Sequence, residues 1–492
     1  MAFPIPLMVC LLCLLGLTAA ASSSLRSCLL SAVDNDATLA AFKGDLLYQT
    51  LAVKAYNLNY PVTPAAVTFP TSSAQVSEIV QCASTLGYKV QAKSGGHSYA
   101  NYGLGGTNGA VVVDLQHMKF FTYNPTTQQA TVGAGMLNGE LDTHLVAAGN
   151  RAVSHGTSPQ IGIGGHATIG GLGPTARQWG MELDHVVEAE VVLANGSVVR
   201  ATATENADLL FAIKGAGASF GVVTEFVLRT EAAPAEAVQY TYTFDLLGSA
   251  AERADLFAQW QGFITEKDLS RKLASIITIL SGSVVISGTF FGSKAEFEAL
   301  GLADRFPGAT PGNSSALVFT DWLGLAAHWA EQSILDLTGD IPAHFYARCL
   351  GFREDTPISA DGVQQLFEYL DTAHTGALLW FVIFDLEGGA INDVPMGETG
   401  FAHRDVLFWM QSYAVTLGQV GQTTYDFLDG INEVIRNNTP GLGDAVYPGY
   451  VDPRLEDPRH SYWGDNLARL QRIKTAVDPD DVFHNPQGVL PA

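Results

Sequence analysis

A single histidine stands among five glycines in the stretch QAKSGGHSYANYGLGG, which runs from Gln91 to Gly106 and begins at the end of an apolar segment. Glycine has no side chain, so its backbone can approach a ligand closely and present N–H groups to an anion. The stretch therefore predicts a loop whose backbone binds a ligand, with His97 as its lone imidazole. The question is what this imidazole does there.

Two further glycine-rich clusters, IGIGGHATIGGLG and KGAGASFG, follow in the first half of the chain. Each cluster alone is typical of an ordinary tight turn, but the three together indicate a cofactor that carries phosphate. A Rossmann loop is excluded, because Gly215, Gly217 and Gly221 follow a predicted helix and have the wrong last spacing. No Walker A pattern is present either.

The sequence contains no motif typical of a metal site or of a serine hydrolase. His155, His166 and His185 are not spaced four residues apart on one helix face, and no H-E-x-x-H is present. The C-x-x-C pair formed by Cys10 and Cys13 lies at the extreme N-terminus, and no G-x-S-x-G elbow occurs. We therefore expect no metal site.

The elements that must position these loops alternate between short β-rich runs and helices from about residue 67 to 230. Ser72 and Gln75 form a capping-box pattern at the start of one helix, and Gly149 is placed to end another. Asn195-Gly196 predicts the turn of a β-hairpin in HVVEAEVVLANGSVVRA.

A Pro/Ala-rich stretch, EAAPAEA, predicts a boundary, and longer strands with amphipathic helices follow it. We expect a first domain at 22–235, a second α+β domain at 236–444, and a tail at 445–492. The tail is expected to form one helix and an extended end that returns to the first domain.

The chain has 492 residues, of which 47% are hydrophobic, and a formal net charge of −23. This charge repels nucleic acid and anionic lipid, so we expect no binding to nucleic acid or membrane. Leu7 to Leu17 is apolar, shorter than the ~20 residues that span a bilayer, and is followed by small residues. Residues 1–21 thus predict a secretory signal peptide, although its basic start is missing, and a buried helix is the alternative.

Secretion permits disulfides, and three cysteines follow residue 21. We expect Cys28 to pair with Cys82, tying the N-terminus to a helix, and Cys349 to be a buried thiol. Asn195, Asn313 and Asn437 each begin a glycosylation sequon, which also favours an extracellular protein.

The motifs KSGGHSYANYGLGG, GTSPQIGIGGHATIGGLG, NADLLFAIKGAGASFGVVTEF, YPGYVD and DPDDVFHNPQGV occur in an order that resembles the FAD-linked oxidases of the vanillyl-alcohol oxidase type. The resemblance covers nearly the whole chain after residue 21 and is best to the berberine-bridge-like branch, including the fungal oligosaccharide oxidases. It implies an α+β fold, with a PCMH-type FAD-binding domain and a substrate domain whose antiparallel sheet is covered by helices.

In this family the matching position of His97 is bonded covalently to the 8α-carbon of the flavin. The cofactor-binding positions that the resemblance implies are Gly95, Gly96, Ser98, Ser158, Gly164, Gly165, Gly170, Gly171, Gly173, Gly221, Val223 and Asn485. Many relatives have a second bond from the cysteine of GTCP, but this chain has Ser158 there. A hydroxyl is not ionised as a thiolate is, so we expect one covalent link only.

The resemblance also implies the catalytic groups. Tyr450 matches a catalytic base and Asp385 the carboxylate that assists it, because a phenol with a pKa near ~10 requires a partner to give up its proton at neutral pH. Ile161 matches an oxygen-access position, where valine is typical of oxidases and leucine of dehydrogenases. Isoleucine leaves open whether O₂ or another acceptor takes the electrons.

Substrate positions implied by the resemblance are Tyr99 and Gln411, with Trp380 and Phe381 as candidates to stack on a sugar ring or simply to pack in a core. Ile383 replaces a glutamine of the sugar oxidases. We expect a secreted FAD-dependent enzyme that oxidises a CH–OH group, foremost the anomeric carbon of a mono- or oligosaccharide. The alternatives are an oxidase of a secondary metabolite, such as an alkaloid or alcohol, and a non-catalytic binding protein.

Overall fold

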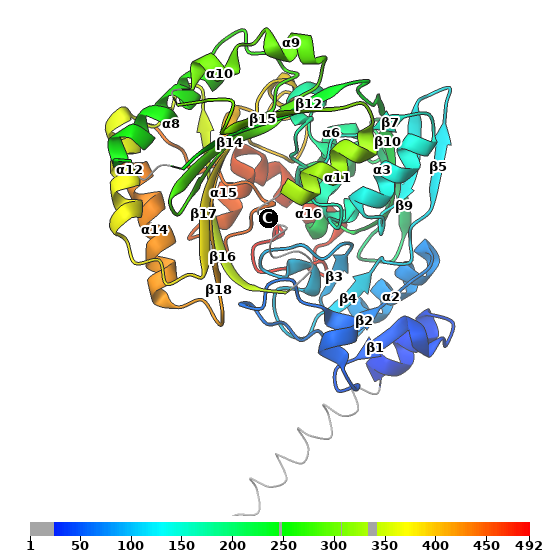
Figure 1. Ribbon diagram of the computed structural model, residues 1–492. Helices are drawn as coiled ribbons and strands as arrows, with labels where there is room; N and C mark the ends of the chain where they lie inside the picture. The colour runs from blue at the N-terminus through cyan, green and yellow to red at the C-terminus, as the bar shows by residue number, and fades with distance from the viewer. Residues whose placement is uncertain (1–23, 246–247, 307, 333–341) are drawn as a thin grey trace, which may run out of the picture.

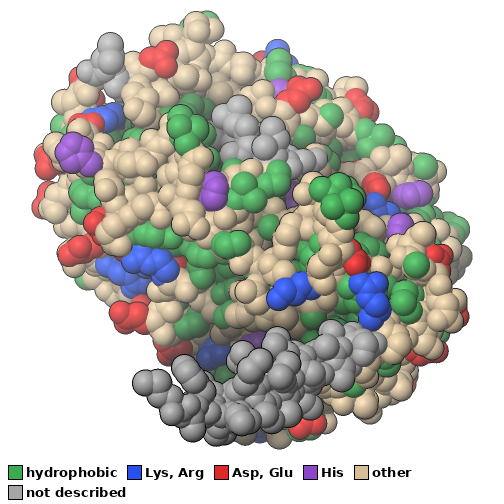
Figure 2. All heavy atoms as spheres, turned by 90° about the horizontal axis from the view of Figure 1, so that it is seen from below, with side chains coloured by type: hydrophobic (Ala, Val, Ile, Leu, Met, Phe, Trp, Pro, Cys, Tyr) green, Lys and Arg blue, Asp and Glu red, His purple; other side chains and the backbone are tan. Residues whose placement is uncertain are grey.

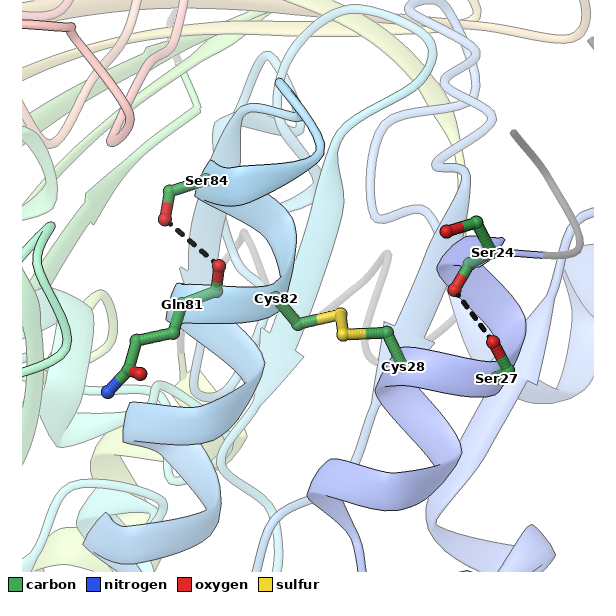
Figure 3. The surroundings of a disulfide bond; sticks show 6 residues. All are labelled: Ser24, Ser27, Cys28, Gln81, Cys82 and Ser84. Atoms are coloured by element: carbon green, nitrogen blue, oxygen red, sulfur yellow. Dashed lines mark hydrogen bonds between the residues drawn. A yellow bond between two sulfur atoms is a disulfide. The ribbon is translucent and has the colours of Figure 1, made fainter. Parts of the chain in front are cut away.

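The computed structural model describes residues 24–245, 248–306, 308–332 and 342–492 (Figure 1). The predicted signal peptide lies outside the described residues. The first described segment is a helix over residues 24–32, which a disulfide joins to helix α2 (Ser73–Thr85) through Cys28 and Cys82 (Figure 3). The predicted pairing is confirmed, and Cys349 is a free, buried thiol as expected.

The first half of the chain forms two sheets that share one hydrophobic core. In the four-stranded sheet, ordered β1-β2-β4-β3, strands β2, β4 and β3 are parallel and β1 is antiparallel. The strands are β1 (Ala40–Phe42), β2 (Ala66–Thr68), β3 (Val90–Lys93) and β4 (Val111–Asp114). The other sheet is antiparallel, ordered β5-β6-β10-β8-β9: β5 (Phe121–Asn124), β6 (Gln129–Gly133), β8 (Val186–Val192), β9 (Val198–Ala201) and β10 (Val222–Arg229).

Local sequence explains these elements. Ser72 accepts a hydrogen bond from the Gln75 backbone at 3.3 Å and caps α2, while the Gln75 side chain accepts from the Thr71 backbone one residue earlier than an ideal capping box. Gly196, with φ +81°, makes the predicted turn between β8 and β9. The other helices of this half are α3 (Asn138–Ala147), α4 (Ile163–Ile169), α5 (Ala176–Trp179), α6 (Glu182–His185) and α7 (Ala207–Ala216).

The two short strands β7 (Arg151–Ala152) and β11 (Glu231–Ala232) pair with each other near the end of this half. The chain then enters a seven-stranded antiparallel sheet ordered β15-β12-β14-β13-β17-β18-β16. Its strands are β12 (Ala237–Phe244), β13 (Ile276–Leu280), β14 (Ser283–Phe290), β15 (Ser314–Phe319), β16 (His344–Arg353), β17 (Leu379–Leu386) and β18 (Val406–Thr416).

Three long helices cover one face of this sheet (Figure 1). Alternate strand residues such as Tyr240 and Phe384 pack there against α8 (Ala250–Ile264), α12 (Ala360–Thr372) and α14 (Gln422–Asn437). The remaining helices are α9 (Lys294–Glu298), α10 (Leu302–Arg305), α11 (Trp322–Gln332) and α13 (Ala390–Asp393). The opposite face is turned to the first half, and this α+β architecture confirms the predicted fold class. The predicted domain boundaries stay predictions.

The tail packs on the first core, where Val90 forms an isolated bridge with Phe483. It contains more helix than we expected: α15 (Pro458–Trp463), a 3₁₀ turn η6 (Gly464–Asn466) and α16 (Leu467–Val477). Pro458 at the first turn and the Asp457 side chain, which accepts from the His460 backbone at 3.3 Å, explain the additional helix α15.

On the face seen from below, basic side chains form only small groups (Figure 2). Among the described residues, no helix is both long and apolar enough to cross a membrane.

Candidate functional site

A cavity of about 710 Å³ lies between the first half of the chain and the face of the large sheet that points away from α8, α12 and α14. All three glycine-rich clusters contribute to its wall. Of the predicted cofactor-binding positions, these line the cavity: Gly95, Gly96, Ser98, Ser158, Gly164, Gly165, Gly173, Gly221, Val223 and Asn485. Gly170 and Gly171 do not, because they face Tyr447: a Cβ on Gly170 would lie 2.6 Å from its ring, and the Gly171 N–H donates to its hydroxyl at 2.9 Å.

Two glycine-rich loops touch backbone to backbone in this wall. A Cβ on Gly95 would lie 2.4 Å from the Gly162 nitrogen, and a Cβ on Gly162 would lie 2.0 Å from the Gly95 nitrogen. The Ser94 hydroxyl joins the loops, because it donates to the Ala134 carbonyl at 2.7 Å and accepts from the Gly164 N–H at 3.4 Å. Only glycine permits this approach, which leaves an open cradle without side chains. A large cofactor that carries phosphate fits such a wall.

His97 lines the cavity, and its ring stacks on Tyr56 with centroids 4.7 Å apart. The loop that carries it is fixed by Asn101, which has φ +55° and accepts from the backbone N–H groups of Tyr56 and Asn57. Asn57 in turn donates to the carbonyls of Tyr99 and Phe345. The histidine is therefore held at a defined place in the wall.

Ser158 and Ile161 also line the cavity, beside the contact between the loops. The Ser158 hydroxyl donates to the Gln160 side chain at 2.9 Å. Their predicted roles stay predictions, but both side chains are in place to face a bound cofactor.

Strand register brings the substrate candidates together on the face of the large sheet that borders the cavity. Asp385 on β17 pairs with Ile276 on β13 and with Trp409 on β18. Ile383, two residues earlier, pairs with Thr278 and Gln411. All of these residues line the cavity, so the carboxyl group of Asp385 lies in a row of otherwise neutral side chains.

Tyr450 also lines the cavity and lies next to Tyr99. Its ring stacks on Tyr99 with centroids 6.0 Å apart, and the Gln411 amide donates to the Tyr99 hydroxyl at 3.0 Å. Burial raises the pKa of Tyr450 well above its ordinary value, and the neighbouring Tyr99 and Asp385 raise it further. Burial likewise raises the pKa of Asp385, to about 7. The Tyr450 phenol therefore loses its proton only if a neighbouring group accepts it. Asp385 is the carboxyl group whose charge acts on this phenol.

A second carboxyl group, Glu387, is buried next to Asp385. Burial raises its pKa well above the ordinary range, and Asp385 adds to the shift while Arg177 opposes it. The Arg177 guanidinium donates to the Glu387 backbone carbonyl and, at 2.8 Å, to that of Leu273. This contact joins the first half of the chain to the strand that carries Asp385.

Two aromatic candidates lie elsewhere. Trp380 faces the helix-covered side, where it packs against Phe427, because neighbouring residues of a strand point to opposite faces. It belongs to the core and does not stack on a ligand in the cavity. Phe381 is on the cavity side but is covered: it stacks on Tyr413 at 5.0 Å, is 1% exposed and does not line the cavity.

Sequence reasoning missed a row of neutral polar residues on β12 and β14 that line the cavity, among them Thr241 and Ser287, which pair directly. Alternation of polar and apolar residues in VQYTYTF was the available signal. Within the described part of the chain, no group of three His, Cys, Asp or Glu residues is placed to hold a metal ion.

Comparisons with known proteins identify the family of the chain. Residues 64–202 match the family described as FAD binding domain, and residues 446–490 match berberine and berberine like. The FAD-linked oxidoreductase sorD of Penicillium rubens is 40% identical over 96% of this chain and 99% of its own length. The xylooligosaccharide oxidase of Thermothelomyces thermophilus is 33% identical over 89% of each chain.

Solved structures are similar over the whole fold. A chitooligosaccharide oxidase superposes with a TM-score of 0.86 at 29% identity, covering 95% of this chain and 100% of that one. A glucooligosaccharide oxidase from Acremonium strictum, described with a 6-S-cysteinyl, 8α-N1-histidyl FAD, superposes with a TM-score of 0.85 at 30% identity, covering 95% and 99%. With its fold, its two family segments and relatives matched end to end, this chain belongs to the berberine-bridge-like family of FAD-dependent oxidoreductases.

Proposed function

We propose that this enzyme oxidises a CH–OH group of a small neutral molecule, foremost the anomeric hydroxyl of a mono- or oligosaccharide. The observation that carries the proposal is the corner where Tyr450, Tyr99 and Gln411 meet Asp385 at the cavity wall. Several relatives are named as oxidases of xylo-, gluco- and chitooligosaccharides, which supports the sugar substrate.

The glycine wall fits FAD, with its diphosphate along the loops that Gly95 and Gly162 bring together. His97 would hold the flavin by one covalent bond, and Ser158 would form none. When bound, FAD supplies the acceptor for the hydride that leaves the substrate carbon.

Two side chains, Tyr450 and Asp385, transfer the proton that the substrate hydroxyl loses. Tyr450 accepts the proton of the substrate hydroxyl as its own phenolic proton passes to the Asp385 carboxylate. The raised pKa of Tyr450 disfavours a free phenolate, so the two transfers are coupled. Gln411 and Tyr99 orient the substrate hydroxyl through hydrogen bonds.

The test is stopped-flow reduction of the flavin without oxygen, using a panel of reducing sugars and apolar alcohols. Replacing Tyr450 by Phe should slow reduction ~10²–10⁴-fold with little change in substrate affinity, because the phenol acts only as the proton moves. Rates close to those of the unaltered enzyme would assign the base to another group, with Tyr447 as the nearest alternative. Repeating the assay with O₂ and with an artificial acceptor would identify the oxidant.

A less polar alcohol, such as a secondary metabolite, is the second candidate. Ile276 and Ile383 flank Asp385 on the cavity face, where a sugar would present several hydroxyl groups. The relative with 40% identity is named only as a FAD-linked oxidoreductase. Faster flavin reduction by apolar alcohols than by sugars would favour this candidate.

We also propose that the enzyme is secreted. The apolar N-terminal run and the Cys28–Cys82 disulfide support this location. Protein recovered from culture medium should begin near residue 22, whereas intracellular protein that retains residues 1–21 would contradict the proposal.

A further inference from the structure

His155 is a buried histidine that the proposed reaction does not use. It precedes Gly156, which lines the cavity, and is 4% exposed. Its Nε2 lies 3.0 Å from Asp142 Oδ1 and its Nδ1 lies 2.8 Å from the Gly156 carbonyl oxygen. Both partners are acceptors, so only a ring with a proton on each nitrogen can satisfy both contacts.

The surroundings support this charged form. Asp142 on α3 also accepts from the Trp322 indole at 2.6 Å, so the anion is fixed from a second side. Burial opposes the charge, but Asp142 outweighs it, and the pKa of His155 rises to about 9. Glu182, the other acidic side chain acting on His155, is itself fully buried, and burial raises its pKa to about 8. Burial therefore favours the neutral form of Glu182, which reduces its effect on the imidazolium.

Two other histidines contact the same loop, and burial lowers the pKa of each, which favours the neutral ring. The His166 Nε2 accepts from the Gly156 N–H at 2.9 Å, and burial lowers the pKa of this ring to about 3. The His185 Nε2 accepts from the Ser154 N–H at 3.4 Å while its Nδ1 faces the Arg229 carbonyl at 2.9 Å. Burial lowers the pKa of His185 to about 4. Of these three rings, only His155 has an acceptor opposite each nitrogen, which favours the doubly protonated, positively charged form.

We propose that His155 is a positioning residue, protonated at neutral pH, that places a positive charge behind the cofactor wall and favours electron uptake by FAD. The proposal rests on the placement of FAD in the cavity. Oxidation of a CH–OH group sends a hydride, with two electrons, to FAD and the hydroxyl proton to Tyr450. Reduction therefore adds negative charge to the cavity. His155 and Asp142 form a neutral pair, but Gly156 next to His155 lines the cavity and no residue of α3, which carries Asp142, does. The positive end of the pair is thus the end nearer to the cavity, and in a low-dielectric interior it stabilises the added charge.

The first test examines the ring itself in the holoenzyme. In ¹⁵N NMR at pH 8, ordinary histidines are neutral, so His155 should stand out as a ring with two protonated nitrogens. The signal should vanish in His155→Gln and persist in His185→Gln. If every ring shows an unprotonated nitrogen at pH 8, the proposal fails, whatever the enzyme oxidises.

The second test measures the midpoint reduction potential of the flavin and its affinity for sulfite. His155→Gln and Asp142→Asn should both lower the midpoint potential and weaken sulfite binding to the flavin about tenfold, because each removes the stable imidazolium. His185→Gln is the matched control: it removes a buried but neutral ring and should leave the potential unchanged. Equal potentials in all folded variants would overturn the proposal, and so would an equal fall in the control. Failure of the proposed function would show as absent reduction by substrates, with these potentials unaffected.

Discussion

At the residue scale, the chemistry depends on a carboxyl group and a phenol whose pKa values are raised by burial. Asp385 is the only acid in its row of the cavity face, and its raised pKa places its titration near neutral pH. Tyr450 cannot act as a free phenolate, so its use as a base depends on Asp385. The two side chains therefore act as one unit, and their effects on the rate should be less than additive.

Asp385→Asn should slow flavin reduction and also change how stability depends on pH. The folded protein binds the Asp385 proton more tightly than the unfolded chain, so stability falls as pH rises from about 3.8 to about 7. The amide has no charge to bury, and at pH 8 the variant should be more stable by about 1–3 kcal/mol. Urea unfolding at pH 4 and pH 8 measures this difference.

The flavin-reduction rate of the unaltered enzyme should rise with pH through about 7, as the carboxylate forms, and the variant should lose this rise. A gain in stability that is equal at both pH values would contradict burial of the charge as its cause.

Ser158→Cys tests the second covalent bond. Ser158 lines the cavity and donates to Gln160, so a thiol at this place should reach the flavin if the ring lies along this wall. We expect partial formation of a bond to flavin C6 and a higher reduction potential. In His97→Ala, flavin should come free on denaturation, whereas in His97→Ala with Ser158→Cys part of it should stay bound. No retained flavin in the double variant would contradict the placement of Ser158.

At the element scale, alternation along single strands was readable from sequence, but the pairing of strands was not. The hairpin at Asn195-Gly196 and the Ser72 cap follow from local residue types and were predicted correctly. Trp380 and Phe381 were both considered for substrate stacking, although neighbours on one strand face opposite sides. The row that joins Ile276 to Asp385 depends on register between distant strands, which no local pattern specifies.

Gly162→Ala should prevent correct folding of the cofactor wall. Its Cβ would overlap the Gly95 nitrogen at 2.0 Å, and neither backbone can move without breaking the contact between the loops. Gly262→Ala on α8 is the control, because a Cβ there meets no protein atom within 4 Å and the residue does not line the cavity. We expect the first variant to lose soluble, flavin-containing protein and the second to fold normally, as judged by circular dichroism. Normal folding and flavin content of Gly162→Ala would show that the loops can separate.

At the scale of the whole molecule, the sequence indicated the class and the cofactor site but not how the two halves are joined. The glycine clusters and the motif order predicted the FAD wall, and most of the predicted wall residues line the cavity. Many contacts between the halves come from single polar or aromatic residues without a motif. Arg177 binds two carbonyls of the large sheet and its flank, and Trp322 donates to Asp142.

Asn57 is another such contact, and its replacement should uncouple the halves. The buried Asn57 amide donates to the Tyr99 carbonyl at 2.7 Å and to the Phe345 carbonyl on β16 at 3.0 Å. Asn57→Leu keeps the size but leaves both carbonyls without a donor, which should cost about 2–4 kcal/mol. Tyr99 lies beside Tyr450 at the cavity, and Phe345 belongs to the large sheet. On heating, we therefore expect two separate transitions: flavin fluorescence should rise first, as the cavity opens, and the circular dichroism signal of the β-structure should be lost at a higher temperature. Asn124→Ala, which removes only local contacts to the Thr126 and Thr127 backbone in an exposed turn, should leave both transitions together. Coincident transitions with unchanged midpoints in Asn57→Leu would mean that other contacts carry the coupling.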